Sequence, residues 1–184
     1  MDTPAMQRYA KLMSAVGVHF LTRDQNTSDL LLAAGADPGQ VGTYADLSFG
    51  AKRYVDRHVA FLDSEEAWHW LQAQGRPYLV VSLRNCHRNP PDLASRVAQA
   101  FDGVCERRDV SVLYLPLDTD DVGIQRQAYD LMEHKERAYL IGQRSTVETI
   151  LGYISRSSAT LSMRLHCSLL HMVLGRPAVG LNYN

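Results

Sequence analysis

From residue 77 onward, short apolar runs alternate with longer segments in which apolar residues recur every three or four positions. The short runs have the length and composition of buried strands, and the longer segments have the periodicity of helices. Strands are predicted at residues 78–83, 110–115, 138–141, 159–162 and 178–183. Helices are predicted at residues 93–104, 120–132, 147–154 and 166–174. This alternation predicts a Rossmann-like α/β domain, a doubly wound parallel sheet covered on both faces, over residues 77–184.

The first 50 residues carry similar but weaker signals. Helices are predicted at residues 10–16 and 28–34, and strands at residues 17–21 and 41–47. Two strands cannot form an independent parallel domain, so residues 1–50 are interpreted as the tail of an N-terminal Rossmann-like domain. Residues 51–76 are predicted to be a linker and a connecting helix. A covering helix is expected after the last strand, and both ends of the chain therefore suggest an excerpt from a longer protein.

Composition and charge exclude several classes of partner. Of the 184 residues, 46% are hydrophobic, and 19 basic residues balance 20 acidic ones, which argues against nucleic-acid binding. Cys86, Cys105 and Cys167 are odd in number and widely spaced, so neither a disulfide framework nor a metal site is predicted. No apolar run reaches the ~20 residues of a membrane span, and the amino terminus lacks a secretory signal. We therefore expect a cytoplasmic chain with no transmembrane segment.

The tripeptide Arg164-Leu165-His166 is the strongest candidate for chemistry. It lies between the strand predicted at residues 159–162 and the helix that follows, so it places a fixed cation and a titratable imidazole at a strand end. Ligands bind at this edge of open α/β sheets, and a helix amino terminus favours anions. The structural alternative is that the arginine caps a carbonyl group and bonds a neighbouring carboxylate.

Other polar residues are expected near the same edge. Arg84 ends the first strand of the predicted sheet, where it faces a shared cleft or, alternatively, lies on the surface opposite Asp118 or Asp120. These aspartates and Asp121 suggest either a metal site or, more simply, the capped amino terminus of a helix.

Two further features are assigned structural roles. His171 lies five positions after His166, hence on a different face of the helix, and is predicted to be a packing residue. Ser145 and Glu148 have the spacing of a capping box before the helix at residues 147–154.

The end of the chain resembles the polysaccharide pyruvyl transferase family. The strongest match is Leu161-Ser162-Met163-Arg164-Leu165-His166, followed by an apolar helix, Gly175-x-Pro177 and a strand leading to Tyr183. After the position of Asn184 the family usually continues with an acidic residue and a lysine, which lie beyond the sequence.

Two earlier motifs resemble the same family in the expected order. One is Arg23-Asp24-x-x-Thr27 with Gly35 and Asp46 after it, although the family usually has serine at the position of Thr27. The other is Val80-Val81-Ser82-Leu83-Arg84, which matches the first strand of the family's second domain. The resemblance implies the C-terminal half of a GT-B-type fold, with residues 77–184 as the donor-binding domain.

The resemblance also implies an activity, in which pyruvate passes from phosphoenolpyruvate to a sugar as a ketal. Arg84 and Arg164 would grip the phosphate and carboxylate of the donor, with the Leu165 amide as a further hydrogen-bond donor. His166 would transfer protons, since the pKa of histidine lies near neutrality. Phosphoenolpyruvate is then a substrate, and no cofactor is expected.

The implied partners are phosphoenolpyruvate and a sugar or lipid-linked saccharide of a cell-surface polysaccharide or exopolysaccharide, and a homo-oligomer is also considered. Two alternatives stay open: a GT-B-type glycosyltransferase that uses a nucleotide sugar, and a non-catalytic α/β binding module. This chain alone is expected to bind the donor but not to catalyse transfer, because the acceptor side of the cleft is expected in the missing part of the first domain.

Overall fold

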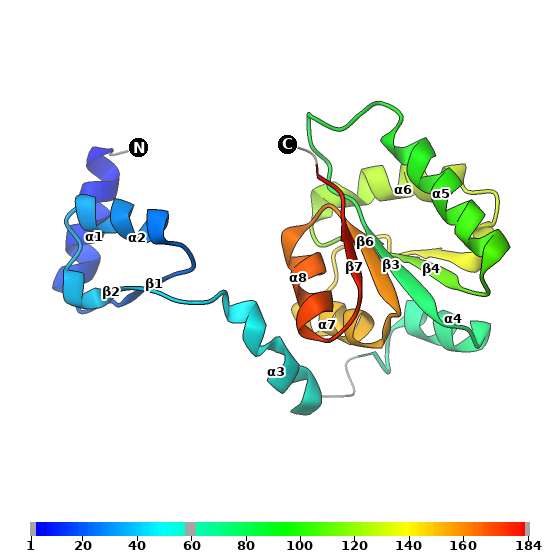
Figure 1. Cartoon of the computed structure of the whole chain (residues 1–184), viewed down its shortest axis with the longest axis horizontal. Coiled ribbons are helices and arrows are strands. Elements are labelled where there is room, and N and C mark those ends of the chain that lie inside the picture. Colours follow the sequence, from blue (N-terminus) through cyan, green and yellow to red (C-terminus); the bar gives the residue numbers. More distant parts are fainter. Residues whose placement is uncertain (1–2, 58–61, 183–184) are drawn as a thin grey trace. The chain divides into compact units, whose positions relative to one another are not determined.

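Five parallel strands form the sheet that the sequence predicts (Figure 1). The computed structural model describes residues 3–57 and 62–182. The strands are β3 (Tyr78–Ser82), β4 (Ser111–Tyr114), β5 (Ala138–Leu140), β6 (Ala159–Ser162) and β7 (Ala178–Gly180). Their spatial order is β5-β4-β3-β6-β7, and every pairing in it is parallel. Because this is the strand order of a Rossmann-like sheet, the predicted fold class is confirmed.

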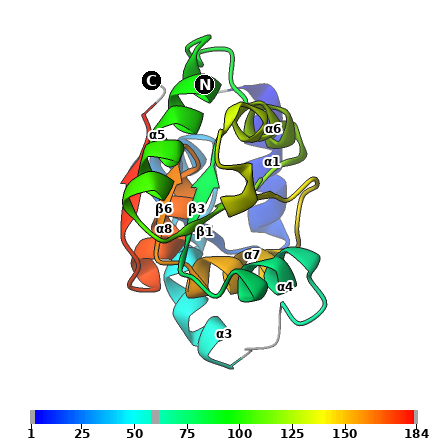
Figure 2. The ribbon, with the colours of Figure 1, turned by 90° about the vertical axis from the view of Figure 1, so that its right-hand side faces the viewer.

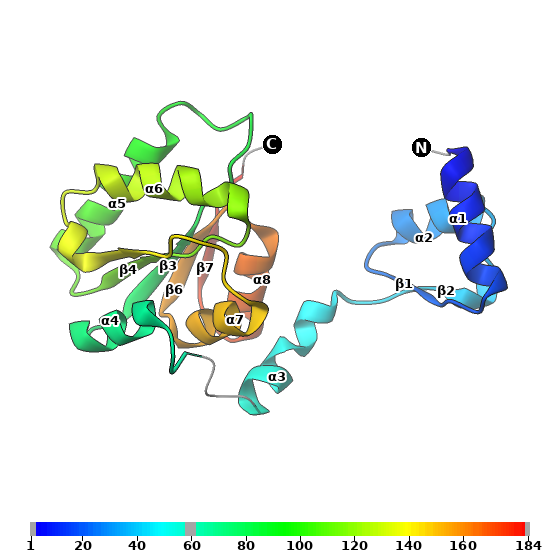
Figure 3. The ribbon, with the colours of Figure 1, turned by 180° about the vertical axis from the view of Figure 1, so that it is seen from behind.

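Helices cover both faces of the sheet (Figure 2). One face is covered by α5 (Leu93–Arg107) and α6 (Val122–Leu131). The other is covered by α4 (Glu66–Gln74), α7 (Val147–Arg156) and α8 (Leu165–Val173), as Figure 3 shows from behind. Successive strand residues point to opposite faces, so Val81 packs under α5 and α6 while Val80 packs under α4 and α7. Both valines are fully buried, which is why the strand reads as a continuous apolar run.

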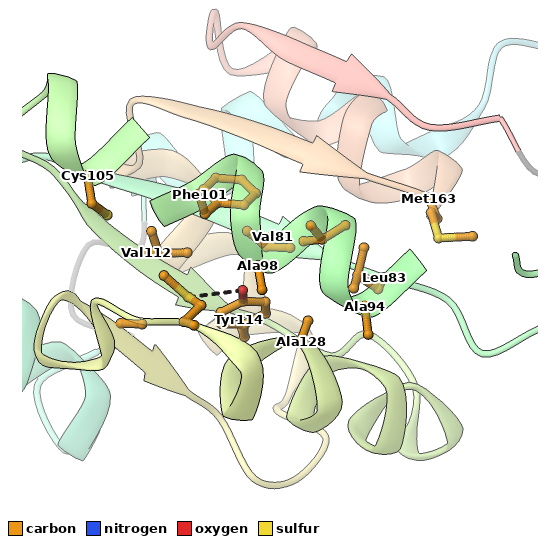
Figure 4. Close-up of a cluster of buried hydrophobic side chains, with 13 residues drawn as sticks. Val81, Leu83, Ala94, Ala98, Phe101, Cys105, Val112, Tyr114, Ala128 and Met163 are labelled. Atoms are coloured by element: carbon orange, nitrogen blue, oxygen red, sulfur yellow. Dashed lines mark hydrogen bonds between the residues drawn. The ribbon is translucent and has the colours of Figure 1, made fainter. Parts of the chain in front are cut away.

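The core under α5 and α6 combines large side chains of the sheet with small side chains of the helices (Figure 4). Val112 and Tyr114 of β4 lie against Ala98 of α5 and Ala128 of α6, and all four are almost fully buried. Alanine lets a helix approach a sheet closely, and the aromatic ring then fills the remaining space. The phenol of Tyr114 donates a hydrogen bond to the sulfur of Met132 at 3.2 Å.

The cap of α7 differs from the one that the sequence predicts. The helix cap there is Thr146, whose hydroxyl oxygen accepts a hydrogen bond from the Thr149 amide at 3.2 Å. The predicted capping box at Ser145 is therefore wrong by one residue, because a neighbouring threonine competes for the same role. After α4 the chain turns at Gly75, whose φ of +64° favours glycine.

The chain divides into two compact units, Met1–Phe49 and Gly50–Asn184, and the five-stranded sheet belongs to the second. The first unit contains a parallel pair of short strands, β1 (Phe20–Thr22) and β2 (Val41–Thr43). Its helices are α1 (Pro4–Ala15) and α2 (Gln25–Ala33), with the short 3-10 helices η1 (Pro38–Gln40) and η2 (Leu47–Gly50) after them. The strand predicted at residues 41–47 is shorter than expected because Asp46 accepts a hydrogen bond from the Ser48 amide and starts a turn.

The segment predicted as a linker begins with a helix, α3 (Ala51–Arg57). Lys52 and Asp56 form an ion pair one turn apart at 3.3 Å on its surface, so mixed charges here belong to a helix rather than to an irregular linker. The phenol of Tyr54 lies 3.5 Å from the Glu148 carboxylate, which connects α3 with α7. At the other end, the predicted last strand stops at Gly180, and Tyr183 lies outside the described residues.

Candidate active site

The carboxyl ends of β3 and β6 lie side by side where the strand order reverses. Ser82 is paired with Ser162, and the Met163 amide donates to the Ser82 carbonyl oxygen at 2.9 Å. In the sheet, β4 lies next to β3 on one side of this point, and β7 lies next to β6 on the other. Ligands of open α/β sheets bind outside such a switch point. Arg84 and Arg164 each follow two residues after a paired serine, so strand pairing brings both predicted arginines to this edge.

The guanidinium group of Arg164 forms a two-point ion pair with Asp121. Nε and Nη2 donate to the two carboxylate oxygens at 2.8 and 2.6 Å. Asp121 is fully buried, whereas the Arg164 side chain keeps 24% of its surface exposed. The carboxylate of Asp118 is more distant, at 3.9 Å. The structural alternative for Arg164 predicted a bond to a neighbouring carboxylate, and Asp121 provides that carboxylate. The contact orients the guanidinium group but leaves it partly exposed.

The aspartates after β4 do not cap a helix. Asp121 stands at the start of α6 and Asp118 at the start of the 3-10 helix η3 (Thr119–Asp121), but neither makes a side-chain capping bond. The predicted capping role is therefore wrong for both. The Asp121 oxygens are taken by Arg164 and by the Asn85 amide, 3.2 Å away, and the Asp118 carboxylate faces Arg164 at a longer distance. Within residues 3–57 and 62–182, no group of three or more His, Cys, Asp or Glu side chains could hold a metal ion.

A serine hydroxyl fixes the turn from β6 into α8. Ser162 Oγ accepts a hydrogen bond from the Arg164 amide at 2.9 Å and donates one to the Arg164 carbonyl oxygen at 3.0 Å. Arg164 takes the capping position with an extended backbone and makes no side-chain capping bond. The first helical residues, Leu165 and His166, have exposed side chains, whereas Cys167 is buried. The positive end of the α8 dipole is thus at the surface beside Arg164.

The backbone on both sides of Arg84 is held by buried groups. Gln125 is fully buried and donates from Nε2 to the Leu83 carbonyl oxygen at 3.2 Å. The Arg84 carbonyl oxygen accepts from the Asn89 side chain at 2.7 Å, and the Arg84 side chain is half-buried. Sequence reasoning missed Gln125, and it did not pair Asp121 with Arg164. A signal that could have found Asp121 and Gln125 is their spacing of four residues at the start of α6, which places them on one helix face.

The two histidines of α8 lie in different environments. His166 is exposed at the start of the helix, whereas His171 is fully buried. His171 lies 2.9 Å from the Ser157 hydroxyl through Nε2 and 2.7 Å from the Cys167 carbonyl oxygen through Nδ1. Burial lowers the pKa of His171 and raises the pKa of the Cys167 thiol, so both stay neutral near pH 7. The predicted packing role of His171 is confirmed.

A sequence model of the family described as "Polysaccharide pyruvyl transferase" matches residues 2–184. The chain belongs to the polysaccharide pyruvyl transferase family. The family predicted from the three ordered motifs is therefore confirmed, and this is a family of transferases. A comparison with curated protein sequences gave no match.

Solved structures that resemble this pyruvyl transferase family member include enzymes of GT-B type. The S. aureus MnaA–UDP structure aligns with a TM-score of 0.64 at 12% identity over 94% of the chain. The UDP-GlcNAc 2-epimerase from Neisseria meningitidis bound to UDP-GlcNAc gives the same values. The UDP-GlcNAc 2-epimerase from Methanocaldococcus jannaschii in complex with UDP-GlcNAc and UDP aligns with a TM-score of 0.60 at 10% identity over 93% of the chain. The alignments span 45%, 46% and 47% of these proteins, so the chain covers about half their length.

These likenesses concern the fold, since the identities are low. They establish that the five-stranded domain has the architecture of GT-B-type enzymes. None of the helices formed by the described residues is long and apolar enough to span a membrane.

Proposed function

We propose that this chain provides the donor side of a transferase that moves pyruvate from phosphoenolpyruvate to a saccharide as a ketal. The observation that carries the proposal is the pairing of β3 with β6, which brings Arg84, Arg164 and the amino terminus of α8 to one edge of the sheet. Phosphoenolpyruvate carries a phosphate and a carboxylate within one small molecule. Two guanidinium groups and a helix amino terminus match this charge pattern.

Each group has a separate role in donor binding. Arg164 would bind the phosphate or the carboxylate with the guanidinium group that Asp121 orients, and Arg84 would bind the second anionic group. Leu165 is the first residue of α8, so its amide points out of the helix end, as the first amides of a helix do. Guanidinium groups suit these roles because they stay charged and bind planar oxyanions at two points.

His166 is assigned to proton transfer. In the first step a sugar hydroxyl oxygen bonds to C2 of phosphoenolpyruvate, its proton leaves, and the methylene carbon gains a proton. In the second step another hydroxyl oxygen of the sugar bonds to C2, its proton leaves, and the C2–O bond to phosphate breaks. The products are a pyruvate ketal and inorganic phosphate. An exposed imidazole at the donor edge suits general acid or base catalysis near neutral pH.

The acceptor is a saccharide destined for a cell-surface polysaccharide, and the enzyme would act in the cytoplasm. Residues 77–184 are assigned to donor binding and residues 1–50 to the end of the domain that faces the acceptor. Because the chain covers about half the length of its structural neighbours, transfer is best tested in the intact enzyme and donor binding in this chain.

A nucleotide-sugar enzyme is the second candidate, since MnaA was solved with UDP and the Neisseria meningitidis epimerase with UDP-GlcNAc. Calorimetric titration of the chain with phosphoenolpyruvate and with UDP-GlcNAc separates the two candidates. The first predicts that phosphoenolpyruvate binds, and that Arg84→Ala weakens its binding about tenfold or more. Arg88→Ala is the matched control, because Arg88 is exposed in the loop after the same strand. Binding of UDP-GlcNAc alone would reject the pyruvyl transfer.

A further inference from the structure

Asp121 has no part in the proposed chemistry, yet it is the most completely engaged carboxylate at the donor edge. It is fully buried. Its oxygens accept from Nε and Nη2 of Arg164 and from the Asn85 amide, so it connects the start of α6 with both strands of the switch point. When both partners of a buried ion pair are replaced by apolar residues, the stability of the protein is often unchanged or raised. Stability alone therefore gives a weak reason for a carboxylate at this place.

One turn later on α6, Gln125 holds the other side of the same loop. It donates to the Leu83 carbonyl oxygen, while Asp121 accepts from the Asn85 amide. Arg84 lies between these two anchored backbone groups. The first turns of α6 thus fix two things: the backbone on both sides of Arg84 and the guanidinium group of Arg164.

We propose that Asp121 is a positioning residue that sets the relative placement of Arg84 and Arg164 for a donor with two anionic groups. This inference rests on the proposed donor site. A guanidinium group has five N–H donors, and Asp121 engages two of them along one edge, which fixes the plane of the group. A guanidinium group that is already oriented loses less conformational entropy when a ligand binds, so binding costs less free energy. The spacing of the two cations then selects a ligand whose phosphate and carboxylate have the matching separation.

A purely electrostatic role for Asp121 makes the opposite prediction. If the carboxylate only reduced the positive potential of Arg164, its removal would tighten the binding of anions. If Asp121 positions the guanidinium group, its removal weakens binding although the net charge becomes more favourable for an anion. The sign of the change in affinity therefore distinguishes the two roles.

The test titrates the chain with phosphoenolpyruvate and compares Asp121→Asn with Asp118→Asn. Both changes remove one negative charge, but Asp118 is 55% exposed and lies 3.9 Å from Arg164. We expect Asp121→Asn to raise the dissociation constant about ten- to a hundredfold. Asp118→Asn should change it less than threefold or tighten binding slightly. An unchanged or tighter dissociation constant for Asp121→Asn would overturn the positioning role.

Combination with Arg164→Lys tests whether Asp121 acts through Arg164. Lysine keeps the charge but lacks the planar fork, so Asp121→Asn should have a much smaller effect in that background. An equal effect in both backgrounds would show that Asp121 acts on the fold in general, which contradicts the proposal. If the wild-type chain does not bind phosphoenolpyruvate, the proposed function fails with it. If the wild type binds and the variants do not differ, only the positioning role fails.

Two further measurements test the same role through a spectroscopic readout and through a second residue. The 15N–1H resonance of Arg164 Nε, assigned by its loss in Arg164→Lys, should be protected from solvent exchange in the wild type and in Asp118→Asn, and exposed in Asp121→Asn. Gln125→Met keeps the volume of the side chain but removes the bond to the Leu83 carbonyl oxygen. It should weaken phosphoenolpyruvate binding about threefold to tenfold without moving that resonance. Unchanged affinity in Gln125→Met would contradict the role of α6 in placing Arg84.

Discussion

Helix α8 carries His166 on its exposed first turn and His171 on its buried side. The exposed turn lies at the carboxyl edge of the sheet, beside Arg164 and the ion pair with Asp121. The buried side packs with Tyr78 and Tyr153 in the core between α7 and the sheet. One histidine of this helix is therefore exposed at the edge of the sheet, whereas the other is buried and hydrogen-bonded in the core. Changes at the two positions should separate activity from stability.

The largest effect is expected from His166→Ala in the intact enzyme. Loss of a positioned acid or base should lower the rate of ketal formation about 10²–10⁴-fold. The free energy of unfolding should stay within about 0.5 kcal/mol of the wild type, because the side chain is exposed. Phosphate release and ketal formation are measured together, with His87→Ala as the control at another exposed histidine. Wild-type rates in His166→Ala would remove this residue from the mechanism.

His171→Ala should have the converse effect. Truncation leaves the Ser157 hydroxyl and the Cys167 carbonyl oxygen without their partner and opens a cavity, which should lower the free energy of unfolding by about 3 kcal/mol. Urea unfolding followed by the fluorescence of Trp68 and Trp70 reports this unit alone, since both tryptophans lie on α4. The folded fraction should bind phosphoenolpyruvate like the wild type. Equal stability would contradict the structural role of His171.

A smaller effect is expected from Leu165→Pro. Proline is tolerated at the first position of a helix, and Arg164 before it already has the extended backbone that proline favours. The change therefore removes one amide donor without breaking α8, and it should weaken phosphoenolpyruvate binding about tenfold. Leu165→Ala keeps the amide and serves as the control. Equal affinities for the two variants would exclude the Leu165 amide from the donor site.

The smallest effect concerns pH. Burial lowers the pKa of His171 below its ordinary value of 6.5, so between the two values the unfolded chain binds a proton that the folded chain does not. The stability that neutral His171 contributes is complete above pH 6.5 and is lost as the pH falls toward the lowered pKa of the folded state. Urea unfolding at pH 7.5, 6.5 and 5.5 should show a steeper loss for the wild type than for His171→Gln. Parallel losses would assign the pH dependence to other groups.

The sequence was sufficient for those features that depend on local pattern and strand order. The central strands β3 and β4 are buried almost throughout and form continuous apolar runs, so their positions were predictable. The edge strand β7 is largely exposed, and its predicted end was too late. The alternation of strands and helices then implied which strand ends share an edge. The common edge of Arg84 and Arg164 was predictable for this reason.

The partner of Arg164 was not predictable in the same way. Asp121 lies 43 residues from Arg164 in the sequence, at the end of the 3-10 helix η3 that leads into α6. Short-range rules assign aspartate at such a position to a helix cap, and a tertiary contact with a guanidinium group prevailed here. The helix α3 was missed for a different reason: its mixed charges favoured a linker, whereas Lys52 and Asp56 pair one turn apart within a helix.

The pairing of β3 with β6 also has a consequence for how the protein is made. Thr160 donates to the Val80 carbonyl oxygen across 80 residues of sequence, whereas β3 and β4 are joined by a much shorter connection. Contacts between distant segments form slowly, because a long loop must close before they stabilise anything. During synthesis Arg84 emerges well before the strand that brings Arg164 beside it. An anion that bridges both arginines can therefore bind only after this long-range pairing, and its binding rate during refolding would time that step.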